Sequence, residues 1–232
     1  MKFKNKLIAS KFIKRYKRFF VDVENNGKTL VSHCANSGSM LGLLTKNNKS
    51  WISACHNPKR KLKYTLEIIN DGKSNVGVNT HYANYIVEDA IINKQIKELN
   101  KYDKFSREVK FGLNSRFDFL LANKNQRAFL EVKSVTLSRE VGIAEFPDSV
   151  TTRGLKHLEE LIKAKNEGYN SFLIYLVQRE DCDKFRIAKD IDPEYFKGFL
   201  NAKKNGVKFI CYSCNVNEKG ININKSIQIL LN

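Results

Sequence analysis

Residues 115–136, SRFDFLLANKNQRAFLEVKSVT, contain two apolar runs on either side of a polar turn. This pattern predicts the two strands of a hairpin, and runs as apolar as FDFLLA and AFLEV are typical of strands covered on both faces. The hairpin therefore requires a layered fold. Asp118, Glu131 and Lys133 interrupt the apolar runs. A charged residue inside a buried strand costs stability unless it is paired or bound to a metal, so these three need an explanation.

Glu131 and Lys133 lie two residues apart on one strand, so they project from the same face. If the turn is centred on Asn125, Asp118 lies opposite Val132, and a one-residue shift or a bulge is needed to bring all three charges to one face. Once together, the two carboxylates would hold a hard cation such as Mg²⁺ or Mn²⁺, and the lysine would stabilise charge on a phosphate or position a water molecule. A salt bridge on a solvent-facing sheet is the alternative, and these residues alone leave both readings open.

The chain divides near residue 80. Before it, short strand-like segments are separated by turn signals, and Phe19, Val21 and Val23 alternate as if on one face of a strand; this predicts a small barrel, plausibly of the five-stranded OB type. After it, apolar residues at helical spacing predict a helix, and the later elements give the order αβββαβ plus a further helix and strand. We predict a mixed α/β (α+β) chain with domains 1–80 and 81–232. The expected strands of the second domain are 108–112, 116–122, 128–135, 171–178 and one within VKFICYSC, and the later helices are 153–166 and 192–204.

An Asp, then Glu-x-Lys, within an αβββαβ order is the pattern of the PD-(D/E)xK nucleases. Glu-x-Lys alone occurs by chance in many charged proteins, so the motif and the element order carry the prediction together. We predict Asp118, Glu131 and Lys133 as catalytic residues, with Asp118 and Glu131 as metal ligands. Glu108 would be a further ligand or would orient one, and the alternative is an ordinary exposed glutamate.

Positive charge is concentrated at the start of the chain. Of the net charge of +17, residues 1–63 carry +13, with 15 Lys and Arg against Asp22 and Glu24. Basic residues interleaved with aromatic ones suit a surface that contacts nucleic-acid phosphates and stacks on bases, whereas a lysine-rich solvated face is the alternative. Arg153 and Lys156 open a helix whose N-terminus would also attract phosphate. The predicted DNA-binding residues are Lys14, Arg15, Lys17, Arg18, Lys59, Arg60, Lys61, Arg153 and Lys156.

The N-terminal apolar segment is too short for a secretory signal, and the longest apolar run, FLIYLV at 172–177, is too short to span a membrane. We therefore expect a cytoplasmic protein with no membrane partner. Five cysteines without an export signal indicate reduced thiols. Cys211 and Cys214 have the spacing of a zinc or redox pair, but residues i and i+3 of a strand face opposite ways, which favours a structural role.

The chain resembles the sugar fermentation stimulation protein family of bacteria and archaea over essentially its whole length. Ala35 departs from the proline that the family is expected to have in its H-C-P-N segment, which does not touch the charged motif. The matching segments are RYKRFFVDV (15–23), SHCANSGSM (32–40), HNPKRKLKYTLE (56–67), VGVNTHYAN (76–84), EVKFGLNSRFDFLL (108–121), EVKSVTL (131–137), AEFPDSVTTRGLKHLEEL (144–161) and IDPEY (191–195).

The resemblance implies an OB-like N-terminal domain, a nuclease-like C-terminal domain, DNA binding, and a role linked to expression of sugar-utilisation genes. Nuclease folds are also used for binding alone, so two functions stay open at this point. One is a DNA-binding protein with a divalent-metal-dependent phosphodiesterase site, and the other is a non-catalytic DNA-binding regulator. A sugar-binding or sugar-modifying enzyme has no support in the charge pattern.

Overall fold

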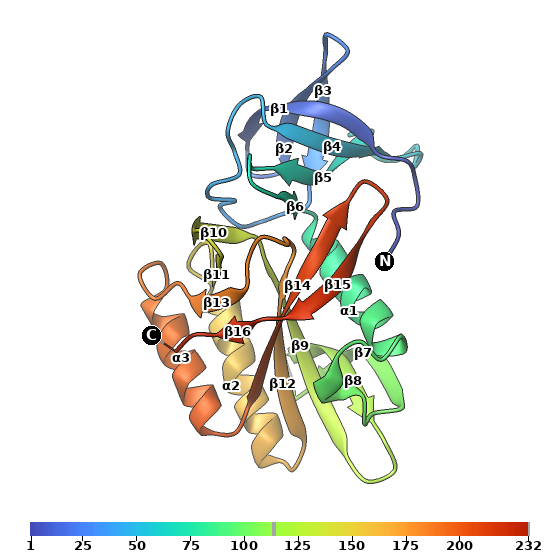
Figure 1. Ribbon diagram of the computed structural model, residues 1–232. Helices are drawn as coiled ribbons and strands as arrows, with labels where there is room; N and C mark the ends of the chain where they lie inside the picture. The colour runs from blue at the N-terminus through green and yellow to red at the C-terminus, as the bar shows by residue number, and fades with distance from the viewer. Residues whose placement is uncertain (113–114, 232) are drawn as a thin grey trace.

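The N-terminal barrel forms from strands whose alternate side chains point inward. The computed structural model describes residues 1–112 and 115–231, and its mixed α/β class with an OB-like barrel confirms the predicted fold class (Figure 1). The barrel strands follow the order β3-β2-β1-β4-β5, and a parallel pairing of β3 with β5 closes them. Their bounds are β1 (Ile8–Tyr16), β2 (Phe20–Asn25), β3 (Lys28–Cys34), β4 (Lys49–Ala54) and β5 (Tyr64–Asn70), followed by the short β6 (Asn75–Gly77) on β5.

Strand β1 was not predicted, because lysine and arginine fill its outward positions and mask the alternation. Phe12 is buried in the barrel core while Lys11 and Lys14 point outward. Val21 and Val23 are fully buried, as their spacing predicts. Phe19, predicted to share their face, instead lies in the turn between β1 and β2 and is 41% exposed. Strand β2 begins at Phe20, one residue later than the alternation suggests.

The second domain contains a six-stranded mixed sheet in the order β15-β14-β12-β9-β8-β7. β9, β12 and β14 are parallel neighbours in its centre, and the outer pairs are antiparallel. The element order from α1 to β12 contains the predicted αβββαβ arrangement. The main elements are α1 (Ala83–Ile92), β7 (Lys104–Phe111), β8 (Ser115–Ala122), β9 (Arg127–Val135), α2 (Thr152–Asn166), β12 (Asn170–Val177), α3 (Pro193–Lys204), β14 (Lys208–Asn217) and β15 (Gly220–Ser226), with 3₁₀ turns η1 (Thr80–Tyr82) and η2 (Lys97–Leu99).

A small second sheet was not predicted from the sequence. It inserts a hairpin between β9 and α2, and its strands are too short to show a clear alternation. They are β10 (Leu137–Glu140), β11 (Ile143–Phe146), β13 (Lys184–Ile187) and β16 (Gln228–Ile229). The hairpin lies between the barrel and the helices α2 and α3 (Figure 1).

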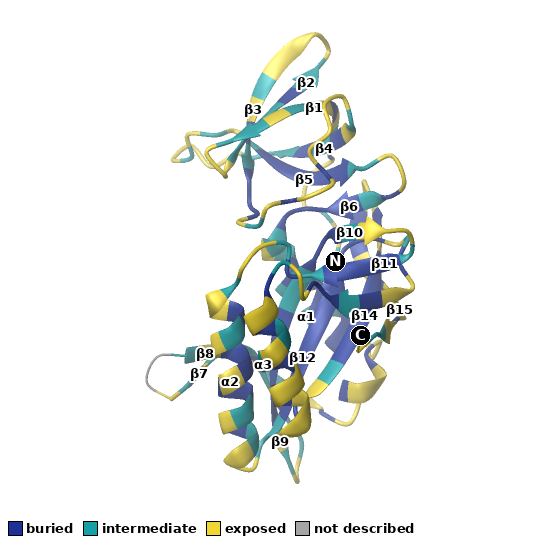
Figure 2. Ribbon diagram, turned by 90° about the vertical axis from the view of Figure 1, so that its left-hand side faces the viewer, coloured by how far each residue is buried: buried dark blue, intermediate teal, exposed yellow. Residues whose placement is uncertain are grey.

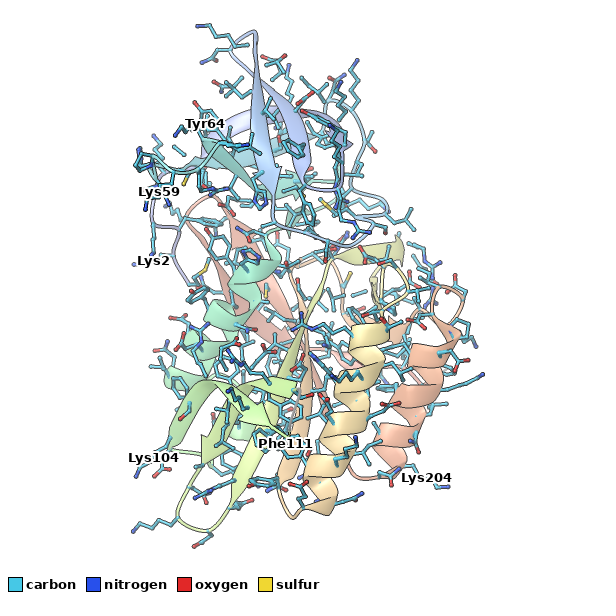
Figure 3. All side chains as sticks on the ribbon, turned by 180° about the vertical axis from the view of Figure 1, so that it is seen from behind. Lys2, Lys59, Tyr64, Lys104, Phe111 and Lys204 are labelled. Atoms are coloured by element: carbon cyan, nitrogen blue, oxygen red, sulfur yellow. The ribbon has the colours of Figure 1, made fainter. Side chains whose placement is uncertain are left out.

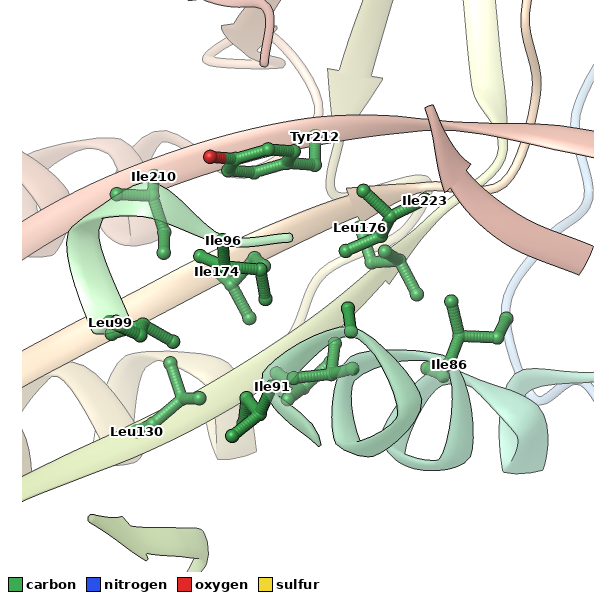
Figure 4. Packing of buried hydrophobic residues seen from close by; sticks show 14 of the residues in the cluster. Ile86, Ile91, Ile96, Leu99, Leu130, Ile174, Leu176, Ile210, Tyr212 and Ile223 are labelled. Carbon is green, nitrogen blue, oxygen red and sulfur yellow. The ribbon is translucent and has the colours of Figure 1, made fainter. Parts of the chain in front are cut away.

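Helices cover both faces of the large sheet, as the apolar hairpin requires. On one face, α1 packs Ile86 and Ile91 against Leu130, Ile174 and their neighbours (Figure 4). On the other face, α2 and α3 bury Leu158 and Phe199 against side chains from the opposite side of the same strands. The buried residues of these helices face the sheet and their exposed residues face outward (Figure 2). Within the described residues, no helix is long and apolar enough to cross a membrane.

The two domains are tied together by buried polar contacts. The backbone N–H of Gly77 donates to the Gln178 carbonyl at 2.9 Å. The guanidinium of Arg179, 1% exposed, donates to Asp71 in the barrel at 2.8 Å and to Asp181 at 2.6 Å. These contacts fix the barrel over the ends of β9 and β12.

Candidate functional site

The hairpin adopts the shifted register that convergence of the three charges requires. Phe119 pairs with Leu130 and Ala122 with Arg127, so the turn lies one half-residue earlier than a turn centred on Asn125. Continued by one pair, this register places Asp118 opposite Glu131 rather than opposite Val132. The pairing of β8 with β9 ends at Phe119 and Leu130. Beyond this pair, the Asp118 side chain connects the two strands by accepting a hydrogen bond from the backbone N–H of Val132.

Asp118 is half-buried between β8, β9 and α1. One carboxylate oxygen accepts a hydrogen bond from the backbone N–H of Val132 at 2.7 Å, and the other accepts from Asn84 Nδ2 of α1 at 2.7 Å. Burial and the negative charge of Glu131 raise the pKa of Asp118 to about 6, although these two hydrogen bonds and Lys133 act in the opposite direction. The Asp118 and Glu131 carboxylates therefore lie close enough to repel each other.

Glu131 is 3% exposed and is paired through only one of its oxygens. Its Oε1 accepts from Lys133 Nζ at 2.8 Å and contacts His157 Nδ1 of α2, while Lys133 Nζ also lies 3.0 Å from His157 Nδ1. Burial alone would raise the pKa of Glu131, but Lys133 and His157 outweigh it and hold the pKa below its usual value. Glu131 is therefore a buried, ionised carboxylate.

The second oxygen, Glu131 Oε2, is buried and has no hydrogen-bond partner among residues 1–112 and 115–231. An ionised oxygen in this position is costly without a cation or a hydrogen-bond donor. In the described part of the chain, no three His, Cys, Asp or Glu side chains converge as a ligand set. Asp118 and Glu131 thus fit a cation that takes two protein carboxylates and completes its shell with water or phosphate oxygens, as Mg²⁺ does.

Glu108 does not join this pair. It lies on the edge strand β7 with a half-exposed side chain, and its carboxylate forms an ion pair with Arg116 at 3.8 Å. Its backbone has a positive φ of 52°, which marks a local distortion of β7 beside Asp118. The structure supports the alternative, an exposed glutamate, and we leave Glu108 out of the metal site.

A cleft of about 390 Å³ opens beside Lys133, between the barrel and the large sheet. It is lined by the end of β9, by the barrel residues Arg18 and Asn36, and by Val150 and Thr151 before α2. Thr151 caps α2, with its side chain accepting from the N–H of Gly154, so the N-terminus of this helix faces the cleft. A helix N-terminus attracts anions. The cleft thus combines Lys133, Arg18 and a helix N-terminus, whereas Asp118 and Glu131 are not among its described lining residues.

The first basic segment divides into structural and exposed residues. Arg15 is committed to the protein itself, since its guanidinium donates to the carbonyls of Arg18, Asn36, Gly38 and Ser39 at 2.7–3.2 Å. This is not the arrangement expected of a phosphate ligand. Lys14 is exposed and lies 3.7 Å from Asp22. Lys17 and Arg18 are exposed in the tight turn after β1.

The second basic segment lies on the flank of the barrel above α1, where Figure 3 labels Lys59. Lys59 and Lys61 are exposed, whereas Arg60 folds back to donate to Thr65 Oγ1 at 3.2 Å. On α2, Arg153 donates to His157 Nε2 at 3.4 Å, and Lys156 forms an ion pair with Glu160 at 3.7 Å. Of the nine basic residues predicted to bind DNA, Arg18 is the one that lines the cleft beside Lys133.

His157 and Asn84 contact the candidate carboxylates and were not among the predicted site residues. His157 is 8% exposed and comes from α2, while Asn84 comes from α1 on the opposite face of the sheet. The available signal was weak: His157 directly precedes Leu158 of the buried stripe, and Asn84 lies in the first turn of its helix. Cys211 and Cys214 are buried in β14, burial raises the pKa of both thiols, and each of the five cysteines is free.

Comparison with known proteins places this chain in a family. Residues 13–78 match the model described as the SfsA N-terminal OB domain, and residues 81–220 match the model described as the sugar fermentation stimulation protein RE domain. A protein of Pelagibacter ubique called sugar fermentation stimulation protein homolog is 52% identical over 99% of both chains. A protein of the same description from Rhodospirillum centenum is 44% identical over 99% of both.

Among solved structures, that of Pyrococcus furiosus SfsA in complex with Ca²⁺ has the same fold, with a TM-score of 0.90 and 23% identity. The match covers 99% of this chain and 98% of that one. The likeness in fold extends over both domains. The chain belongs to the sugar fermentation stimulation protein family.

Proposed function

We propose that the chain binds DNA and hydrolyses its phosphodiester bonds with a divalent cation held by Asp118 and Glu131. One observation carries the proposal: the Glu131 Oε2 atom is buried without a partner in the described chain, beside a second carboxylate whose pKa its charge helps to raise. Two mutually repelling carboxylates beside an ammonium group and a helix N-terminus suit a cation and a phosphate together.

The nature of the ligands supports Mg²⁺ or Mn²⁺. Both carboxylates supply hard oxygen donors, and Mg²⁺ is commonly bound by one or two carboxylates together with water and substrate phosphate. The Pyrococcus furiosus protein of the same fold was solved with Ca²⁺, another cation that prefers oxygen ligands. When bound, the cation would polarise a phosphate oxygen and lower the pKa of a coordinated water molecule.

The protein side chains supply the remaining chemistry. Lys133 lines the cleft, and contacts with Glu131 and His157 fix its Nζ, so its ammonium would face negative charge building on the phosphoryl oxygens. In the reaction, the water molecule loses a proton to solvent and its oxygen bonds to phosphorus as the bond from phosphorus to the ester oxygen breaks. The leaving ester oxygen takes up a proton from solvent. Asn84 and the N–H of Val132 orient Asp118, and His157 orients Glu131.

DNA binding is supported by the exposed basic residues of the barrel. Lys17 and Arg18 lie in the β1–β2 turn, with Arg18 reaching the cleft, and Lys59 and Lys61 lie on the barrel flank. Contacts of this kind go mainly to phosphates and give affinity without sequence preference. We therefore propose binding whose affinity depends strongly on salt.

A non-catalytic DNA-binding regulator is the second candidate, and one observation favours it. Lys133 forms an ion pair with Glu131 at 2.8 Å, so much of the buried charge is balanced by the protein itself. A site satisfied in this way would have no need of a cation. A link to expression of sugar-utilisation genes would belong with this second function.

Cleavage of labelled DNA in Mg²⁺ or Mn²⁺ distinguishes the two candidates. We expect the wild-type chain to cut the DNA, chelation to stop the reaction, and Asp118→Asn and Lys133→Met each to reduce the rate by about a hundredfold or more. Glu108→Gln is the matched control and is expected to keep wild-type activity. Salt-dependent binding without any cleavage by the wild-type chain would favour the regulator.

A further inference from the structure

The proposed site is recessed rather than laid open on a surface. The Lys133 side chain is 12% exposed and the Glu131 side chain 4%, and Lys133 is approached through the 390 Å³ cleft. A cleft of this size suits a ligand the size of one nucleotide, since pockets for drug-sized molecules span about 300–1,000 Å³. B-DNA is far broader, because its major groove alone is about 12 Å wide. A phosphate of an intact duplex would have difficulty reaching so deeply placed a lysine.

A bridge between the domains limits how far the cleft can widen. The barrel loop of residues 36–40 is tied to the loop before α2, where Ser39 Oγ donates to the Asp148 carbonyl at 2.6 Å and the Met40 N–H donates to its carboxylate at 2.9 Å. Both loops line the cleft. A second contact between the domains joins Arg179 to Asp71. Together the contacts limit relative movement of the two domains.

Two exposed apolar side chains line the cleft or follow one of its lining residues in the chain. Phe19, next to Arg18, is 41% exposed, and its ring stacks on His33 with ring centroids 6.3 Å apart and planes 17° apart. Val150, which lines the cleft, is 69% exposed. Paired bases inside a duplex cannot reach such groups, whereas unpaired bases stack on aromatic rings beside basic residues. The basic side chains, the size of the cleft and the exposed apolar surface therefore all favour an unpaired strand as the occupant.

We propose that the cleft takes an unpaired DNA strand, whose backbone passes Arg18 towards Lys133 and whose base stacks on Phe19. This inference rests on the proposed function and specifies its substrate as single-stranded DNA or a single-stranded extension of a duplex. Phosphates of the strand face the basic side chains and the N-terminus of α2. The bases contact the exposed rings of the barrel.

Fluorescence anisotropy with a labelled oligonucleotide tests the inference without any cleavage. In EDTA and at one salt concentration, we expect the single strand to bind about tenfold or more tightly than the same sequence as a blunt duplex. Phe19→Ala should weaken binding of the single strand by about fivefold or more and leave duplex binding unchanged, because the stack is lost. Phe19→Tyr should retain the affinity. Leu200→Ala, another 41% exposed apolar position, is the control.

Equal affinity for single strand and duplex would overturn the inference, as would a Phe19→Ala variant that binds the single strand like the wild type. Phe19 lies in an exposed turn, so the variant should fold, and its thermal melt checks this. Cleavage in Mg²⁺ is scored separately. If both DNAs are cut equally and bound equally, hydrolysis stands and the strand assignment fails. If the binding results are as expected and neither DNA is cut, the strand assignment stands and hydrolysis fails.

Discussion

Buried and half-buried carboxylates in the strands of this protein have different sets of hydrogen-bond partners. Asp118 has hydrogen-bond donors on both oxygens, Glu67 in the barrel has Ser53, Asn79 and Tyr82, and Glu131 has partners on one oxygen alone. The sequence predicted that such charges need partners. It could not predict which of them would lack one, because most of the partners come from segments distant in the chain.

Glu67 gives a pH-dependent test of this compensation. Burial raises its pKa against the effect of its hydrogen bonds and of Arg60. Above the ordinary carboxyl pKa the unfolded chain releases the proton while the folded chain still holds it, so the contribution of Glu67 to stability falls as pH rises through this window. Urea unfolding at pH 4.5 and 7.5 should show Glu67→Gln gaining stability relative to the wild type at the higher pH. The exposed Glu180→Gln should show no such gain, and a parallel pH response of wild type and Glu67→Gln would contradict the assignment.

Variants of Arg15 and Lys17 test which basic residues of the barrel have a structural role and which bind DNA. Arg15→Lys should lower the free energy of unfolding by about 1–3 kcal/mol, because charge-assisted bonds to several carbonyls are lost. Lys17→Ala should leave stability unchanged but reduce the slope of log affinity against log salt by about 1. Chemical unfolding and binding titrations at several salt concentrations measure the two effects. A reversed pattern, with Lys17 needed for stability, would contradict these roles.

Among the helices and strands, the spacing of apolar residues was the reliable basis for prediction. The hairpin, the three main helices and the central strands were predicted because their apolar residues repeat at strand or helix spacing. β1 was missed because Lys11 and Lys14 occupy its outward positions, and β10, β11, β13 and β16 are too short to show a period. The candidate site was predictable as far as Asp118, Glu131 and Lys133. The register of the hairpin and the contacts of Asn84 and His157 depend on tertiary packing. Local sequence patterns do not reveal such packing.

Gly38 tests the bridge between the two loops. A Cβ at this position would lie 2.4 Å from the Asp148 carboxylate, so Gly38→Ala must move that carboxylate, which accepts the hydrogen bond from the Met40 N–H. We expect a loss of about 1–3 kcal/mol in stability, typical of an overpacked contact, which thermal or urea unfolding would detect. Ser37→Ala, at the neighbouring exposed position, is the control. An unchanged stability in Gly38→Ala would show that the bridge is looser than described.

For the whole molecule, the barrel and the sheet domain act as one unit because Arg179 joins them. Arg179→Met leaves Asp71 without its ion pair across the domains, and we expect a loss of about 3–5 kcal/mol, the cost of breaking a buried pair. We also expect barrel and sheet signals to separate into two unfolding transitions, followed by fluorescence of Trp51 in β4 and by far-UV circular dichroism. Arg186→Met, at a more exposed guanidinium, is the comparison. One unchanged transition in Arg179→Met would contradict the coupling.

Both domains contribute residues to the candidate site and its cleft. Its carboxylates come from β8 and β9, their orienting groups from α1 and α2, and the cleft wall from the barrel. Its central requirement is that the carboxylate pair holds a divalent cation, with Glu131 Oε2 as an oxygen ligand.

Isothermal titration of the DNA-free protein with Mn²⁺ tests that requirement most directly. The account predicts one cation per chain in the wild type, with affinity reduced by about tenfold or more in Glu131→Gln, which keeps an oxygen for Lys133 but removes the charge. Glu108→Gln should bind like the wild type. The absence of saturable binding by the wild-type chain, or equal affinity in Glu131→Gln, would contradict the account.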